Sequence, residues 1–185
     1  VDVVCGELPD LEIEPGSFDV VTFFHVLEHL AHPCEYLRAA HRALHDGGLL
    51  VVEVPDCSSA GFRVLGARSF TFDYPHHLLF FTPDSLRCVV ERCGFQVVGV
   101  SRFSFEYSPY TTLQNLLNLL PGRPCRLYRA LMRNSEGRAL RRSPWTWMHG
   151  VLALLLAGPA FALSLCPLVV PPGNTLRFYC RKQQR

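Results

Sequence analysis

The chain has 185 residues, of which 49% are hydrophobic and 18% are charged, and its formal net charge is +2. These values exclude a disordered chain, and they fit one domain, or one domain with an appendage, that buries about 70% of the surface exposed by the unfolded chain. The net charge hides an asymmetry, because residues 1–60 carry eleven acidic and two basic residues, whereas residues 61–185 carry five acidic and sixteen basic ones. The basic part could meet anionic lipid or an acidic substrate. It shows no basic cluster interleaved with aromatic residues, so nucleic acid is not a predicted partner.

The first part of the chain predicts strands that alternate with helices. Residues 1–4 are interpreted as the end of a strand. Residues 18–24 form an unbroken apolar and β-branched run, which predicts a strand buried on both faces. A helical turn that ends near His32 follows. Residues 33–45 then predict a helix with a proline at its first position, which the sequence Asp46-Gly47-Gly48 ends.

The same alternation continues to about residue 103. Residues 49–54 predict a second fully buried strand, which Pro55 ends. Pro83 begins another helix, with Leu86, Val89 and Val90 as its apolar face, and Gly94 ends it. Residues 95–103 alternate well enough for a strand.

The pattern changes after residue 106. Residues 107–120 and 123–140 predict two short helices, the second strongly basic, and residues 175–180 alternate as a last strand. We therefore predict three parts: an α/β core over residues 1–106, a helical cap over residues 107–172, and a last core strand with a basic tail over residues 173–185.

Residues 151–170 are apolar except for Ser164, and as a helix they would be about 30 Å long, enough to cross the hydrocarbon core of a membrane. Two arginines and two tryptophans precede the run like an interfacial belt: Arg141, Arg142, Trp145 and Trp147. Three interpretations stay open, namely a cap that lies on a membrane surface or grips lipid, a buried dry cap, and a true span. If this segment crossed the membrane once, the last β-strand would lie on the opposite side of the membrane from the rest of the sheet. Pro159 would instead permit a re-entrant or surface-lying hairpin.

The eight cysteines are scattered along the chain with no CxxC pair. This pattern is typical of reduced thiols rather than of a disulfide framework or a zinc ribbon. It predicts a protein of the cytoplasm, either free there or attached peripherally to a membrane.

Three segments together resemble one known family. Residues 17–30, SFDVVTFFHVLEHL, resemble the fourth-strand segment of class I S-adenosylmethionine-dependent methyltransferases, in the broad group that includes ubiquinone-biosynthesis O-methyltransferases. Residues 37–56 resemble the family's next helix, GG turn and fifth strand, and residues 73–98 its following strand–helix–strand passage. The resemblance implies a three-layer, Rossmann-like α/β methyltransferase fold that lacks its first strands, with a helical apolar insertion before the last strand.

The same resemblance implies S-adenosylmethionine as the cofactor and a small or lipid-like molecule as the methyl acceptor. The family's glycine-rich first loop, and the acidic residue that ends its second strand, should lie upstream of Val1. We therefore expect the 185-residue chain by itself to bind the cofactor very poorly and to be inactive. The alternative function is a non-catalytic, membrane-associated module or fragment.

Two places resemble the family's cofactor contacts. Gly6, Glu7 and Leu8 resemble the Gly-Asp step that meets the adenine amino group, with Glu one methylene longer than Asp. Phe24 and His25 stand where the strand ends and where family members hold the methionine part of the cofactor. A Glu7 side chain that only contacts solvent is the alternative at the first place.

Four polar residues could take part in the chemistry. His25, Glu28 and His29 resemble the family's Glu-x-x-Glu-His pattern, which holds a divalent metal, although His25 replaces the first Glu. Their spacing would place all three side chains on one helix face, and two nitrogens with a carboxylate favour a softer metal than magnesium. His29 could instead be a general base without metal, or could merely brace the helix start. His77 matches a recurrent histidine in the family's loop over the reactive end of the cofactor, and a purely structural bond to the backbone is its alternative role.

Overall fold

The computed structural model describes residues 2–165 and 173–183, and its contacts divide the chain into two compact units. The sheet unit comprises Val1–Pro55, Pro75–Ser101 and Leu176–Arg185, and the helical unit comprises Asp56–Tyr74 and Arg102–Thr175. Residues 56–74, which sequence analysis assigned to the core, therefore group with the helical unit. The predicted division at residues 106 and 172 stays a prediction.

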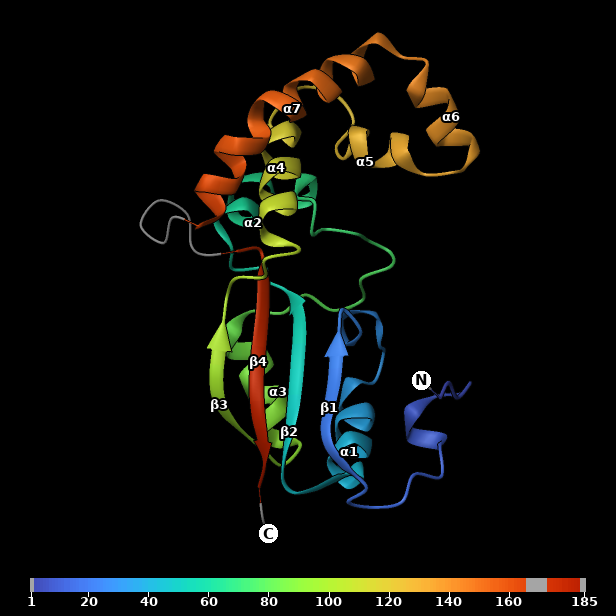
Figure 1. Ribbon diagram of the computed structural model, residues 1–185, viewed down its shortest axis with the longest axis vertical. Helices are drawn as coiled ribbons and strands as arrows, with labels where there is room; N and C mark the ends of the chain where they lie inside the picture. Colours follow the sequence, from blue (N-terminus) through green and yellow to red (C-terminus); the bar gives the residue numbers. More distant parts are fainter. Residues whose placement is uncertain (1, 166–172, 184–185) are drawn as a thin grey trace. The chain divides into compact units, whose positions relative to one another are not determined.

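The sheet unit is built on one four-stranded sheet with the order β1-β2-β4-β3 (Figure 1). The strands are β1 (Phe18–Phe24), β2 (Leu44–Pro55), β3 (Phe95–Ser101) and β4 (Thr175–Lys182). β1 and β2 are parallel, and α1 (Pro33–Ala43) connects them. β3 and β4 are antiparallel, and α3 (Pro83–Arg92) precedes β3. The predicted mixed α/β fold is confirmed.

The core of this unit lies between the sheet and the two helices α1 and α3. Leu37 and Ala40 of α1 and Leu86 and Val90 of α3 are all buried in one cluster with Leu50 of β2. A capping box at Thr82 and Ser85 starts α3, with the Ser85 amide donating to the Thr82 hydroxyl over 3.3 Å. Val89, the third predicted apolar residue of this helix, packs against the same cluster.

The boundaries of β1 agree with the prediction, but its predicted burial on both faces is wrong. β1 is the edge strand of the described sheet, and Phe18, Val20 and Phe24 are 46%, 48% and 50% exposed. These three residues alternate along the strand and so share one face, which no further strand of the described sheet flanks, whereas Phe23 on the other face packs in the core; the apolar sequence therefore reports strand propensity and not burial on both faces.

β2 is buried from Leu50 to Pro55, as predicted, but it begins earlier than expected. The helix before it ends at Ala43, and the strand runs through the Asp46-Gly47-Gly48 sequence that was predicted to be a turn. Gly47 has a φ of +77°, which glycine tolerates, and the pairing register with β1 shifts between Phe18 and Val20. The glycines thus form an irregular start of the strand.

Two further strand predictions are wrong. Val3 and Val4 are 89% and 69% exposed and belong to no strand. Residues 73–80 form turns and irregular structure before α3, where the family resemblance implied a strand.

The helical unit contains α2 (Ala60–Leu65), α4 (Ser108–Asn118), α5 (Arg126–Leu131), α6 (Ser135–Arg141) and α7 (Pro144–Leu165). The single basic helix predicted over residues 123–140 is therefore two helices. Asn134 explains the break, because its side chain caps α6 by accepting a hydrogen bond of 2.8 Å from the Gly137 amide.

The helix α7 starts seven residues before the predicted apolar run and continues through Pro159. The hairpin that Pro159 would permit is therefore absent from residues 144–165, and the end of the run at 166–170 lies outside the described residues. By length and composition α7 could cross a membrane. Its first residue is a proline, which suits the position because the first amide of a helix has no partner within the helix.

Candidate active site at the carboxyl ends of β1 and β2

Two parallel strands deliver charged side chains to the same edge of the sheet. Phe24, the last residue of β1, pairs with Glu53 near the end of β2, and the His25 amide donates to the Glu53 carbonyl over 2.9 Å. Ligands of open α/β sheets bind at the carboxyl ends of parallel strands. The predicted site residues that follow β1 therefore lie at the expected edge of the sheet.

His25 lies between two buried carboxylates. Its Nδ1 is 3.1 Å from Oε1 of Glu28, and its Nε2 is 3.4 Å from Oε1 of Glu53. Glu28 and Glu53 are each 1% exposed, and Glu53 also bonds to the Arg177 guanidinium of β4. His25 has a φ of +53°, in the left-handed region that few residues other than glycine adopt. This backbone conformation turns the chain directly after β1 and keeps the imidazole within reach of both carboxylates.

The side chains of His25, Glu28, Glu53 and Arg177 form a charged network at neutral pH. Burial disfavours the imidazolium of His25, but its contacts with Glu28 and Glu53 outweigh burial and raise the pKa of His25 to about 9. Burial likewise disfavours the Glu53 carboxylate, yet His25 and Arg177 together lower the pKa of Glu53 below its ordinary value. His25 is therefore a cation in this fold, which opposes metal binding through its ring nitrogens.

The raised pKa of His25 predicts a loss of stability at alkaline pH. A histidine whose folded pKa exceeds its unfolded value of 6.5 stabilises fully below pH 6.5, and the contribution disappears as pH rises through about 9. We expect the wild-type free energy of unfolding to fall more than that of His25→Gln between pH 6.5 and 9, by on the order of 2–3 kcal/mol. Urea unfolding at several pH values measures the free energy of unfolding of the wild type and of His25→Gln.

Because the wild type and His25→Gln share all other titrating groups, the contributions of those groups to the pH dependence cancel in the comparison. Burial also raises the pKa of Cys93 to about 11 and that of Cys180 to about 12, so both thiols reduce stability at alkaline pH in either protein. Parallel pH curves for the wild type and His25→Gln would contradict the assigned charge of His25.

His29 presents one ring nitrogen that is suited to accept a proton. Its Nδ1 is 2.9 Å from the carbonyl oxygen of His76, and because a carbonyl only accepts, Nδ1 carries the hydrogen. The neutral ring therefore has its lone pair on Nε2. The His77 ring packs edge-on against the His29 ring, with 4.8 Å between centroids. His29 is exposed, so this nitrogen can meet a substrate.

The segment 76–79 is tied to the turn after β1 by its backbone. The amides of Leu78 and Leu79 both donate to the Glu28 carbonyl, over 2.8 and 3.1 Å. His76 and His77 lie at a turn and not in the extended segment that was assumed, so one contributes its carbonyl and the other its ring. The structure thus brings together His29 and His77, the two predicted catalytic residues.

The group that could hold a metal differs in one member from the predicted set. Ligand atoms of Glu28, His29 and His77 lie within 4.8 Å of one another, whereas His25 is engaged by the carboxylates. The single helix face expected for His25, Glu28 and His29 does not form, because only Leu27–His29 is helical and this is one short 3-10 turn.

The other predicted cofactor contacts lie on exposed backbone. Gly6 and Glu7 are exposed, and Glu7 precedes the 3-10 turn Leu8–Asp10, whose Asp10 amide donates to the Glu7 carbonyl over 2.9 Å. Leu8 packs against the core of the sheet unit. Phe24 is half exposed, with the Arg177 guanidinium 5.5 Å from the centre of its ring. Their cofactor role stays a prediction.

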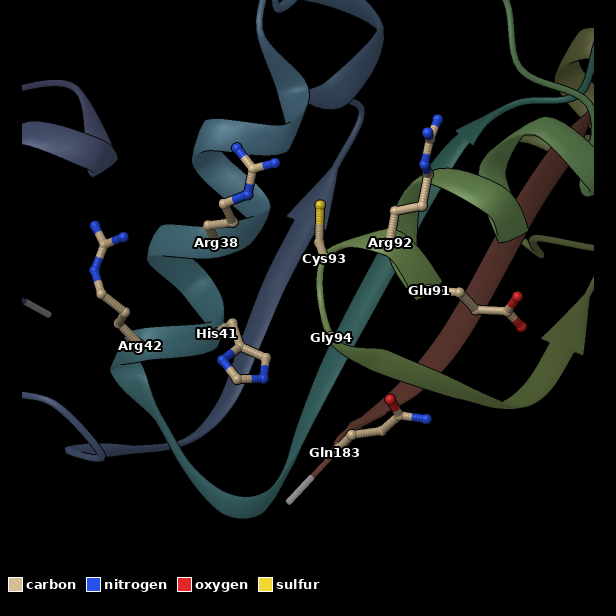
Figure 2. Close-up of a pocket in the computed structure, with 8 residues that line it drawn as sticks. All are labelled: Arg38, His41, Arg42, Glu91, Arg92, Cys93, Gly94 and Gln183. Atoms are coloured by element: carbon tan, nitrogen blue, oxygen red, sulfur yellow. The ribbon is translucent and has the colours of Figure 1, made fainter. Parts of the chain in front are cut away.

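A cavity of about 520 Å³ lies elsewhere in the sheet unit, between the last turns of α1 and α3 (Figure 2). His41 and Arg42 on its wall directly precede β2, so the cavity adjoins the beginning of this strand and not its carboxyl end. Figure 2 shows the His41 ring next to Gly94, and a β-carbon at Gly94 would lie 2.9 Å from its Nε2. Gly94 also has a φ of +90°, so glycine is required there both for space and for conformation.

Sequence reasoning missed Glu53 and Arg177, which complete the charged network. Each left a signal, because Glu53 is the one charged residue in the run LLVVEV and Arg177 interrupts the apolar alternation of TLRFYC. Acidic residues are almost never fully buried without a partner, so Glu53 in a buried strand indicates a nearby cation. That the cation is Arg177, 124 positions away, could not be deduced from the sequence.

Comparison with known proteins places these residues in a described family. A family model described as a methyltransferase domain matches residues 6–100. An uncharacterized 37.1 kDa protein in transposon TN4556 of Streptomyces fradiae is 37% identical over 75 residues, which are 40% of this chain and 19% of that protein. The chain thus spans about a fifth of that curated relative.

Solved structures share the fold. A possible histamine N-methyltransferase from Thermotoga maritima is 17% identical with a TM-score of 0.57, over 99% of this chain and 65% of that one. A SAM-dependent methyltransferase from Archaeoglobus fulgidus is 18% identical with a TM-score of 0.55, over 98% and 67%. The cyclase SpnF is 18% identical with a TM-score of 0.54, over 98% and 56%. A cyclase among these structures shows that the fold alone does not decide the reaction.

Proposed function

This chain belongs to the methyltransferase-domain family, and we propose that it transfers a methyl group from S-adenosylmethionine to a small or lipid-like acceptor. The observation that carries the proposal is the exposed His29 ring, which bonds to the His76 carbonyl through Nδ1 and packs edge-on against His77 at the carboxyl edge of the parallel strands. The cofactor would bind along the backbone of residues 6–8 and 24–25.

In the proposed reaction, an acceptor O–H or N–H attacks the sulfonium methyl in line with the breaking sulfur–carbon bond. A new bond forms between the acceptor and the methyl carbon, the electron pair of the broken bond stays on sulfur, and S-adenosylhomocysteine leaves. Nε2 of His29 takes the acceptor proton, and the His76 carbonyl and the His77 ring hold the imidazole in place. Most of the rate would come from holding the acceptor in line with the methyl group.

The charged network beneath this site would supply rigidity rather than proton transfer. Its carboxylates are buried, and His25 stays protonated at neutral pH. Glu28 links the charged network to the segment 76–79, because its carboxylate bonds to His25 while its backbone carbonyl accepts hydrogen bonds from the amides of Leu78 and Leu79. The network therefore fixes the turn from which His29 projects.

A metal is not part of the proposed mechanism. Glu28, His29 and His77 could supply two nitrogens and a carboxylate oxygen, since Oε1 of Glu28 bonds to His25 but the buried Oε2 has no hydrogen-bond partner in the described structure; the proposed proton transfer to His29 requires no metal. We expect methyl transfer to be unchanged after prolonged dialysis against a chelator. A loss of activity that zinc or manganese restores would contradict the metal-free mechanism and leave the methyl transfer itself intact.

Transfer of a labelled methyl group tests the proposed function. Tritiated S-adenosylmethionine is incubated with a panel of phenols, amines and lipid extract, and S-adenosylhomocysteine is quantified. The assay uses a protein that contains this chain and that binds S-adenosylmethionine, which isothermal titration establishes first. Absence of both cofactor binding and product would favour the second candidate, a non-catalytic membrane-associated module or fragment that has lost cofactor binding, which the exposed apolar face of α7 supports.

A further inference from the structure

The helix α7 shows the reverse of the polarity expected for a helix in water. Its buried positions carry small or polar residues at one- and two-turn spacings: Thr146, His149, Ala153, Ala160 and Ser164. Its exposed positions carry most of its large apolar residues, including Val151, Leu154, Leu155, Phe161 and Leu165. Leu154 and Leu155 are 81% and 68% exposed. A surface helix of a soluble protein buries its apolar side instead.

The helix α4, which packs on α7, buries mainly polar residues and has no exposed position. Its buried side is mainly polar, comprising Ser108, Thr111, Thr112, Gln114, Asn115 and Asn118 with Leu117, whereas Leu119 just beyond its end is 60% exposed. Many of these polar groups are paired, as in the bonds of 2.8 Å from the Thr112 hydroxyl to the Ser108 carbonyl and from the Phe70 amide to Asn115. The pattern of α7, with small and polar residues buried and apolar residues outside, is typical of helices in contact with lipid.

Exposed basic and aromatic residues directly precede the exposed apolar residues of α7 in the chain. Arg133, Arg138 and Arg142 precede α7 and are exposed, and Trp145 and Trp147 in its first turn are 56% and 71% exposed. Residues 102–175 contain eight arginines against two acidic residues, Glu106 and Glu136. The Glu136 carboxylate is already engaged by Arg123 at 2.9 Å and by Arg129 at 3.4 Å. Residues 102–175, which include α7, therefore carry a net positive charge.

We propose that the exposed apolar face of α7, with the exposed arginines and tryptophans that precede it in the chain, docks on the surface of an anionic lipid bilayer. Apolar side chains enter the region between headgroups and acyl chains, tryptophans lie at the level of the headgroups, and arginines meet the lipid phosphates. This assignment does not depend on methyl transfer. It would place the helical unit where a lipid-like acceptor is concentrated.

The packing of α7 favours attachment to the surface over a span. α7 has 22 residues and is long enough to cross, but α4 beside it has 11 residues, about 16 Å, roughly half of the hydrocarbon thickness. The arginine-rich helices α5 and α6 also pack on α7. A span would therefore bring charged residues into hydrocarbon, at a high cost in free energy.

Sedimentation of the full chain with vesicles tests the docking surface. We expect binding to equimolar phosphatidylglycerol–phosphatidylcholine vesicles that weakens as salt is added, and much weaker binding to phosphatidylcholine alone. The double variant Leu154→Glu/Leu155→Glu should lower the partition coefficient about 100-fold. Arg138→Gln/Arg142→Gln should lower it about 30-fold on anionic vesicles only. Circular dichroism should be unchanged in both, because the replaced side chains are exposed.

The matched control is Val98→Glu on β3, where a 54% exposed apolar residue of the sheet unit receives the same charge. Its binding to vesicles should equal that of the wild type. Several results would overturn the proposal: absence of wild-type binding to either vesicle, an equal loss in Val98→Glu, or protein that alkaline carbonate leaves in the membrane and only detergent extracts. The wild type could also fail to bind vesicles and instead form a dimer, measured by light scattering, that Leu154→Glu/Leu155→Glu dissociates. This result would assign the apolar face to a second copy of the chain.

Discussion

His29→Ala should reduce methyl transfer by about 100-fold or more while the affinity for S-adenosylmethionine hardly changes. The reason is the position of the ring, because the His76 carbonyl fixes the proton on Nδ1 and leaves Nε2 free to accept the acceptor's proton. The turnover number and the cofactor dissociation constant are measured for the wild type and the variant in a protein that contains this chain and binds S-adenosylmethionine. The loss should shrink for acceptors whose own pKa is low, since these need no base.

A purely structural role for His29 makes a different prediction. The ring also ties the turn after β1 to the segment 76–79, so its removal could simply loosen this link. In that case the thermal midpoint would fall while the activity per folded molecule stayed the same, and low-pKa acceptors would show no smaller loss. Such a result would remove His29 from the mechanism. His77→Ala provides the comparison, since it removes the edge-on ring contact but leaves the bond between His29 and the His76 carbonyl, and it should cost less than His29→Ala.

Glu53→Gln should destabilise the fold by about 3 kcal/mol or more. Glu53 is 1% exposed and is in contact with both His25 and Arg177, so the neutral amide leaves two cations near each other without their shared carboxylate. Breaking a buried ion pair from one side is costly because the remaining charge stays desolvated. Urea unfolding at pH 7 measures the change, and the pKa of His25 followed by NMR should fall below its wild-type value.

The matched control for Glu53 is Glu91→Gln. Glu91 also pairs with an arginine, Arg87 at 3.3 Å, but both side chains are about half exposed, at 48% and 46%. The control should therefore change stability by less than about 1 kcal/mol. Equal and small effects at the two positions would show that the network of His25, Glu53 and Arg177 does not stabilise the fold as its burial indicates.

The sequence by itself determined the elements whose signals are local. The boundaries of β1, the start of α1 at Pro33 and the limits of α3 follow from short apolar runs, prolines at first helical positions and a terminal glycine, and the structure agrees with them. The ordered set of segments also indicated the methyltransferase family, which the match over residues 6–100 confirms. The site could be located in advance for the same reason, since titratable residues directly after a strand must lie at its carboxyl end.

Only the tertiary structure decided what depends on partners distant in sequence. The charge of His25 comes from Glu53 and Glu28 around it, and Glu53 is held in turn by Arg177, which lies 124 positions away. The exposure of β1 depends on its place at the sheet edge, which its apolar sequence does not encode. In the same way, the apolar run after Trp147 was compatible with a core, a span or a surface helix. The structure places Thr146, His149, Ala153, Ala160 and Ser164 of α7 in the interior and leaves Leu154 and Leu155 exposed.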